Sequence, residues 1–120
     1  MKNNRPTGES LYIAWKLNNA DALAAGHARN LLAQGEGNQL YRLHSWVIVN
    51  GEARALLVPK APLEQIAGAI WAEGDEPLRG RWIAGARSLA ATAREIETAP
   101  VQLGLATRPE QWPFSSASAD

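Results

Sequence analysis

Glu52 and Arg54 are the first pair whose types and spacing could do chemistry. They stand two residues apart, directly after an Asn50-Gly51 pair. Side chains two apart on a strand point to the same side of it, so a strand here would place carboxylate beside guanidinium. Arg54 could then contact a phosphate with two parallel N–H groups. Alternatively, the two charges form a solvent-exposed ion pair worth about 0–1 kcal/mol.

A second group of cations surrounds the last predicted helix. It comprises Arg79, Arg81, Arg87 and Arg94, of which Arg87 and Arg94 are seven apart and share one side of a helix. Such a strip could follow a DNA backbone, or it could be the solvated side of an amphipathic helix. The chain has 12 basic and 12 acidic residues and no net charge, so its overall field does not attract nucleic acid.

The residues that most often carry catalysis are scarce. There is no Cys, which excludes disulfides, thiol nucleophiles and thiolate metal sites. His27 and His44 fall on different predicted elements, and alternation along the strand turns His44 away from Glu52 and Arg54. We therefore expect no metal and no cofactor. A replacement nucleophile such as Ser115, Ser116 or Thr92 would have no recognisable base beside it.

The elements that must position these groups follow from periodicity. Strands are predicted at 10–17, 39–49 and 52–58, and helices at 20–34, 63–71 and 81–98. Asn50-Gly51 predicts a type I′ hairpin turn, which needs positive φ at both positions. Asn18-Asn19 is the expected helix N-cap, and Gly35 and Gly37 the expected stop. This order predicts an α+β layer fold with helices on an antiparallel sheet.

Length and composition set the organisation. At 120 residues the chain predicts a flexible arm at 1–9 and a single domain at 10–120. The core is rich in alanine and therefore lean, which favours support from a partner chain. No apolar run is long enough for a membrane span, and the start has no signal-peptide core, so the cytoplasm is expected and a membrane partner is not.

The tail at 101–119 resembles the closing signature of single-tyrosine transposases of the HUH superfamily, including the REP-associated group. That signature is close to NPVKAGLVxRPEDWPWSSA. The matching residues are Pro100, Val101, Gly104, Leu105, Arg108, Pro109, Glu110, Trp112, Pro113, Ser115, Ser116 and Ala117. Residues 10–17 resemble the family's first strand and 41–49 its YRLxAWVVM segment. The resemblance covers most of residues 8–119, and the stretch 71–81 is shorter than in the family.

The resemblance implies a fold and an ancestral chemistry. The fold is an antiparallel sheet of about four strands with helices packed on it, as in RRM-like and HUH transposase-like domains. The chemistry is cleavage of single-stranded DNA beside hairpins, by a tyrosine on a helix and a Mg²⁺ or Mn²⁺ ion held by a His-x-His pair. The family usually dimerises, and a basic residue in its first strand corresponds to Lys16, which makes Lys16 a candidate phosphate contact.

The chemical residues of that family are replaced here. Glu52 and Arg54 stand where the two metal-binding histidines should be, and Leu78 lies in the region of the nucleophile. The only tyrosines are Tyr12 and Tyr41, both on predicted strands. The sequence thus predicts a transposase-like domain that is degenerate at its catalytic positions and still binds single-stranded or hairpin DNA, through Lys16, Arg54, Arg79, Arg81, Arg87 and Arg94. Two alternatives remain: a dimeric interaction module without nucleic acid, and an active transposase with an unrecognised site.

Overall fold

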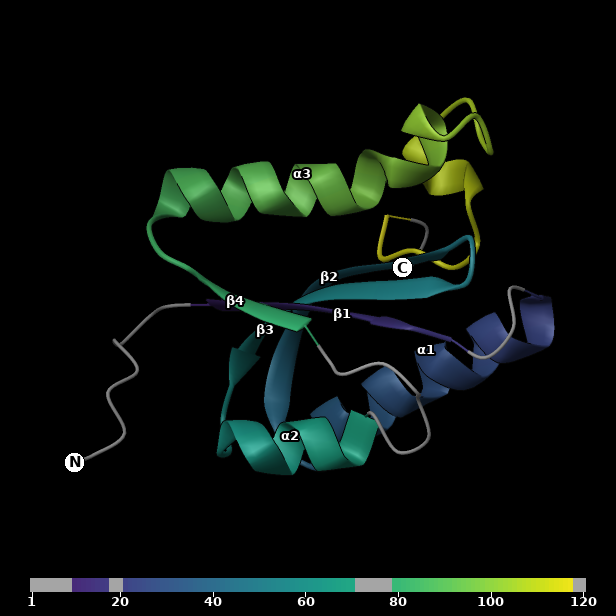
Figure 1. Cartoon of the computed structure of the whole chain (residues 1–120). Helices are drawn as coiled ribbons and strands as arrows, with labels where there is room; N and C mark the ends of the chain where they lie inside the picture. The colour runs from purple at the N-terminus through teal and green to yellow at the C-terminus, as the bar shows by residue number, and fades with distance from the viewer. Residues whose placement is uncertain (1–9, 18–20, 71–78, 118–120) are drawn as a thin grey trace.

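The computed structural model describes residues 10–17, 21–70 and 79–117, and within them the chain forms a four-stranded sheet and three α-helices (Figure 1). The elements are β1 (Ser10–Lys16), α1 (Ala22–Gly37), β2 (Tyr41–Val49), β3 (Glu52–Pro59), α2 (Leu63–Ile70), β4 (Arg79–Ile83), α3 (Ala86–Gln102) and a 3₁₀ turn at Pro109–Gln111. The predicted α+β class is confirmed. The predicted arm at 1–9 lies outside these ranges.

All neighbouring strands of the sheet are antiparallel, in the order β2-β3-β1-β4. The β2–β3 hairpin turns at Asn50 and Gly51, whose φ angles are 51° and 76°. Positive φ at both central positions is the type I′ requirement, so the predicted turn is confirmed. It fixes the register in which Val49 pairs with Glu52 and Val47 with Arg54.

Each side of the sheet is covered by different helices (Figure 1). α1 and α2 pack on one side, over a core that includes Leu11, Ile13, Trp15, Trp46 and Ile48. α3 packs on the other side, mainly over β2. Its core is smaller and comprises Val47, Val49, Leu56, Ile83, Ile96 and Ala99. β1 and β4 are left less covered on the α3 side, and this gap holds the site described below.

The predicted helix at 81–98 is wrong at its start. Arg79–Ile83 is the edge strand β4, and α3 begins only at Ala86. The four-residue step from Trp82 to Ala86 imitates a helical stripe, but Gly85 separates the two elements with a φ of 89°, a conformation that a side chain disfavours. The strand forms because it pairs with β1, a long-range contact that local periodicity does not reveal. Helix α3 also runs past Pro100 to Gln102, where an irregular tail was expected.

The first helix differs from the prediction at both ends. Asp21 is the N-cap, and its carboxylate accepts a hydrogen bond from the Ala24 N–H at 2.9 Å; the expected cap at 18–19 lies outside the described residues. Gly35 does not stop the helix, which continues to Gly37. A Cβ at Gly35 would clash with the Tyr41 ring, so this glycine serves close packing rather than termination.

A β-bulge at His44 changes which side of β2 faces which core. The pairing shifts between Leu43 and Ser45, and the extra residue reverses the alternation of side chains. Tyr41 and Leu43 therefore pack with Trp46 against α1, whereas unbroken alternation would place them on the same side as Val47. From Ser45 to Arg54 the predicted alternation holds.

Among the residues that the structure describes, no helix has the length and apolar character that crossing a membrane requires.

Candidate nucleic-acid interface

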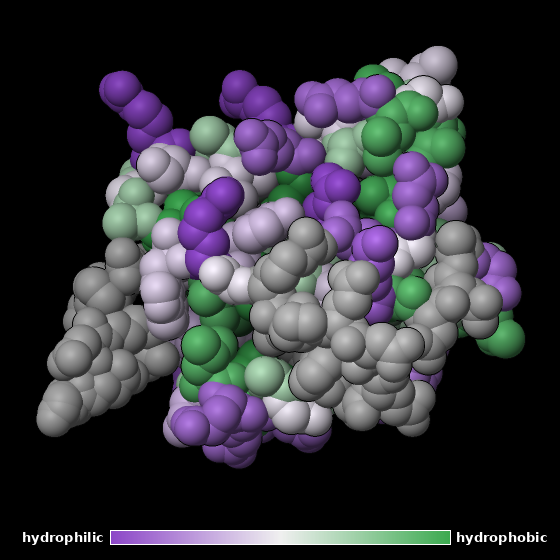
Figure 2. Space-filling model, viewed as in Figure 1, coloured by the Kyte–Doolittle hydropathy of each residue, from purple (hydrophilic) through white to green (hydrophobic). Residues whose placement is uncertain are grey.

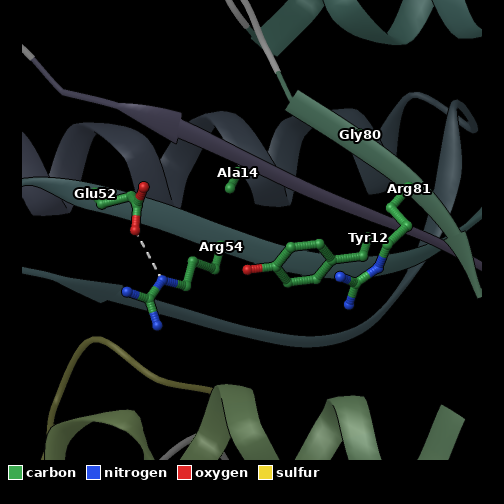
Figure 3. Close-up of a pocket in the computed structure, with 6 residues that line it drawn as sticks. All are labelled: Tyr12, Ala14, Glu52, Arg54, Gly80 and Arg81. Carbon is green, nitrogen blue, oxygen red and sulfur yellow. Dashed lines mark hydrogen bonds and ion pairs between the residues drawn. The ribbon is translucent and has the colours of Figure 1, made fainter. Parts of the chain in front are cut away.

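A hollow of about 350 Å³ lies on the α3 side of the sheet, where β1, β3 and β4 run side by side (Figure 3). Its lining residues are Tyr12, Ala14, Glu52, Arg54, Gly80 and Arg81. We call this feature the groove. Register brings the lining together, because Ala14 pairs with Arg54 on one side of β1 and Tyr12 pairs with Arg81 on the other.

Small residues make the floor of the groove. Ala14 is 5% exposed and lies on β1, between β3, which carries Arg54, and β4, which carries Arg81. A Cβ placed on Gly80 would point to the opposite side of the sheet, towards Leu11 and Ile13, so this position offers the groove only its backbone. A large side chain at Ala14 would fill the space, and its absence is why a hollow exists here.

Glu52 and Arg54 lie on the same side of β3, as their spacing predicts. The Arg54 Nε–H donates to the Glu52 Oε1 at 2.8 Å (Figure 3). The Arg54 side chain is 32% exposed and that of Glu52 is 19% exposed. The pair is therefore partly buried at the wall of the groove, neither fully solvated nor part of the core.

Tyr12 and Arg81 form the opposite wall. The Arg81 guanidinium lies over the Tyr12 ring, with its carbon 5.2 Å from the ring centroid, which is a cation–π contact. Arg81 is exposed and Tyr12 is half-buried. In Figure 3 the Tyr12 hydroxyl is directed towards Arg54. An aromatic ring thus stands between the two arginines. Sequence reasoning missed Tyr12 as a site residue, although Tyr12, Ala14 and Lys16 alternate with apolar residues along their strand.

The remaining predicted cations fall in two places. Lys16 is exposed at the end of β1 and pairs with Glu52 in the strand register, so it extends the groove towards the hairpin. Arg87 and Arg94 are exposed on α3. At 100° per residue they lie opposite Ile96, which packs on the sheet. The outer side of α3 is correspondingly hydrophilic in Figure 2.

Two predicted residues receive no side-chain description. Arg79 pairs with Ala14 in the register of β4, and Leu78 lies outside the described residues. The structure therefore brings Lys16, Arg54 and Arg81 together on one side of the sheet and separates them from Arg87 and Arg94.

The groove does not fit a divalent cation. Of the two positions at which the resemblance expects metal ligands, Arg54 is permanently protonated and has no acceptor, and it already donates to the Glu52 carboxylate. No cluster of three or more His, Cys, Asp or Glu side chains occurs in the described part of the chain. His27 is exposed on α1, and His44 is exposed at the bulge with its Nδ1 2.7 Å from the Ser45 hydroxyl.

Tyr41 is unsuited to attack on a phosphodiester. It is fully buried, and its hydroxyl donates to the Leu32 carbonyl at 2.7 Å. Burial raises the pKa of this phenol far above its ordinary value, with the Glu36 carboxylate adding to the shift. Thr92 and Ser115 are also buried, and the Ser116 hydroxyl donates to Glu97 at 2.8 Å. These hydroxyls serve the packing of α3 and the tail.

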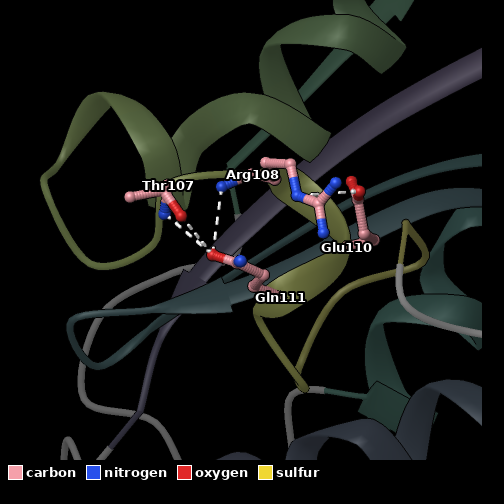
Figure 4. A network of polar contacts seen from close by, with 4 residues as sticks. All are labelled: Thr107, Arg108, Glu110 and Gln111. Carbon is pink, nitrogen blue, oxygen red and sulfur yellow. Dashed lines mark hydrogen bonds and ion pairs between the residues drawn. The ribbon is translucent and has the colours of Figure 1, made fainter.

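The tail that carries the sequence resemblance is held by structural contacts. The Gln111 side-chain oxygen accepts from the Thr107 N–H, the Thr107 hydroxyl and the Arg108 N–H, at 3.0, 2.6 and 3.2 Å (Figure 4). The Trp112 indole N–H donates to the Ile48 carbonyl at 2.9 Å. Beyond it, Phe114 and Ser116 bond to the outer edge of β2. The signature thus closes a turn and covers a sheet edge.

Comparisons with known proteins agree on fold alone. No protein-family model matches the chain, and no curated protein matches it. A solved structure of a REP-associated tyrosine transposase bound to a REP hairpin is similar, with a TM-score of 0.78. The match spans 100% of this chain and 85% of that one at 14% identity. By its architecture, this chain has the fold of a REP-associated tyrosine transposase.

Proposed function

We propose that this protein binds structured single-stranded DNA, such as the single-stranded foot of a hairpin, through the groove, and does not cleave it. The observation that carries the proposal is the gathering of Arg54 and Arg81 around Tyr12, with Lys16 further along on the same side of the sheet. The REP-associated tyrosine transposase whose solved structure has the same fold is bound to a REP hairpin.

The groove has the two features that single strands need. Positive charges follow the backbone, and aromatic rings give the bases a surface on which to stack, at about 1–3 kcal/mol per base. The net charge of the chain is zero, so binding has to come from this local group of cations rather than from the overall field.

Loss of cleavage follows from the same residues. Metal-assisted cleavage needs ligands for a cation, and the positions that should supply them hold the ion pair between Glu52 and Arg54. Tyr12 is the phenol beside the groove, and Arg81 covers its ring. The groove lining contains no His, and its one carboxylate, that of Glu52, accepts a hydrogen bond from Arg54.

Fluorescence anisotropy tests binding. A labelled hairpin with a single-stranded foot should bind at low salt, and a fully paired duplex of the same length should bind more weakly. Three phosphate contacts predict a salt slope of about −2, since each neutralised phosphate of a single strand contributes about −0.7. No signal for any hairpin at low salt would remove the proposal.

A cleavage assay tests the second part. Labelled hairpin DNA incubated with Mg²⁺ or Mn²⁺ should stay intact and form no covalent adduct. The competing candidate is strand cleavage by Tyr12, which its place in the groove favours. A cut product that disappears in a Tyr12→Phe variant would establish that candidate.

The oligomeric state and the alternative role form a further part of the proposal. Leu23, Leu103 and Leu105 are 84%, 47% and 41% exposed, and apolar surface gathers around the end of α3 in Figure 2. We propose a cytoplasmic homodimer, for which sedimentation at tens of micromolar is the test. A dimer that binds no DNA would favour the interaction module, and a strict monomer would exclude the homodimer.

A further inference from the structure

Arg54 already has an acidic partner inside the groove. Its Nε–H donates to Glu52 from two residues away on the same strand. A guanidinium has five N–H donors in a planar fork, so this contact uses part of what Arg54 can offer. The partner also lies at the end of the groove nearest the hairpin turn and pulls the guanidinium to that side (Figure 3).

The two arginines of the groove flank its floor. Arg54 pairs with Ala14 on β3, and Arg81 pairs with Tyr12 on β4. The two arginines are two strands apart and offset by two residues along the strands. Their Cα atoms therefore lie roughly 12 Å apart, since neighbouring strands are about 4.8 Å apart and each residue rises by about 3.4 Å. Two extended arginine side chains can span that separation once Arg54 leaves Glu52 and Arg81 leaves the Tyr12 ring, and both could then reach one small anion beside Ala14.

We propose that the groove holds one phosphate group of a nucleic-acid strand between Arg54 and Arg81, and that Glu52 is an internal competitor which this phosphate displaces from Arg54. The inference rests on the proposed function and names the chemistry of its site.

The exchange is physically reasonable because the internal contact is weak. A partly exposed ion pair is screened by water and contributes little. A phosphate can accept two parallel N–H bonds from one guanidinium, and Arg81 adds a second charge. Glu52 therefore lowers affinity without abolishing it, and it keeps Arg54 paired while the groove is empty.

Removing the competitor is the first test. Glu52→Gln keeps the size of the side chain and removes its charge, so affinity for the hairpin should rise about threefold. Arg54→Gln should lower affinity about tenfold. Glu110→Gln is the matched control, because Glu110 pairs with Arg108 at 3.4 Å in an exposed pair on the tail, and it should leave affinity unchanged.

The double variant separates competition from general charge. If Glu52 acts through Arg54, Glu52→Gln should change affinity less than about 1.5-fold when Arg54 is already Gln. An equal gain in both backgrounds would show a field effect alone and overturn the competitor. An unchanged or lower affinity for Glu52→Gln in the wild-type background would overturn it too.

A steric variant tests the position of the phosphate without touching charge. Ala14→Leu should fill the floor of the groove and lower affinity about tenfold, while Ala33→Leu on the exposed side of α1 should not. Circular dichroism and the thermal midpoint establish that both variants fold. Unchanged affinity for a folded Ala14→Leu would contradict a phosphate above Ala14.

Two further hairpins distinguish an internal phosphodiester from a terminal phosphate. Equal affinity for hairpins that end in a 5′-hydroxyl or a 5′-phosphate would identify an internal phosphodiester, and tighter binding of the 5′-phosphate would identify a terminal group. If the wild type binds DNA but Arg54→Gln and Ala14→Leu bind equally well, the phosphate site fails and the proposed function stands. If the wild type binds no DNA, both fail.

Discussion

The tail and the groove are two regions of one domain that carry different information. The tail matches a transposase signature, and its residues close a turn at Gln111 and attach to β2 through Trp112. The groove contains Glu52 and Arg54, the two positions at which the resemblance expects metal ligands, and these two side chains form an ion pair. The residues of the tail are therefore informative about the fold, and the residues of the groove are informative about binding and chemistry.

The difference teaches that a resemblance is only as informative as the role of the residues that carry it. Pro109, Trp112 and Ser116 are kept in place by a 3₁₀ turn and by hydrogen bonds to the body of the domain. None of them contributes to the lining of the groove. A match in the tail consequently supports the sheet and helix arrangement and leaves activity to be decided at the strands.

The largest expected effect is a loss of stability caused by a substitution in the tail. Trp112→Ala removes a half-buried ring and the indole bond to Ile48, and it should lower the free energy of unfolding by about 2–3 kcal/mol, less than a fully buried Trp. Urea unfolding measures it. Hairpin affinity of the folded fraction should change less than about twofold, and a large loss of affinity with intact stability would place DNA on the tail instead.

The second effect breaks the groove. Arg54→Gln should weaken hairpin binding by about 1.4 kcal/mol, a factor of about ten, because one charge-assisted phosphate contact is lost. Its free energy of unfolding should fall by less than about 1 kcal/mol, since the ion pair with Glu52 is partly exposed. Paired urea and anisotropy titrations check both numbers. The opposite pattern, with stability lost and affinity kept, would make the pair structural.

The smallest expected effect is a loss of stability caused by a substitution in the turn at Gln111. Gln111→Ala removes one acceptor that serves three donors of Thr107 and Arg108. These groups are exposed and can bond to water instead, so the loss should be about 1 kcal/mol in unfolding free energy. Thermal denaturation measures it. Gln111→Glu is the matched variant, because it keeps the acceptor, and stability equal to that of the alanine variant would show that the acceptor is idle.

Much of the fold was predictable because its signals are local. The Asn50-Gly51 turn fixes the hairpin register, and that register fixes the shared side of Glu52 and Arg54. β4 was missed because it pairs with a strand far away in the sequence, as in Tyr12 with Arg81, 69 residues apart. The step from Trp82 to Ala86 also imitates a helix. The bulge at His44 was missed because no residue type requires one there.

The types of residue in the groove were predictable from the sequence, but the way they come together was not. Arg54, Arg81 and Lys16 were identified as cations, but their meeting depends on the register of three strands. Tyr12 was set aside as a strand residue, and only the pairing with Arg81 places its ring in the groove. Arg87 and Arg94 were grouped with the others by sequence proximity, although α3 carries them on its outer side.

An amide NMR titration of the uniformly ¹⁵N-labelled protein with a hairpin that has a single-stranded foot tests the central claim most directly. The account predicts shifts concentrated at Ala14, Arg54, Gly80 and Arg81, with Thr107–Gln111 unmoved. Shifts confined to the tail or to the outer side of α3, with the groove silent, would contradict it.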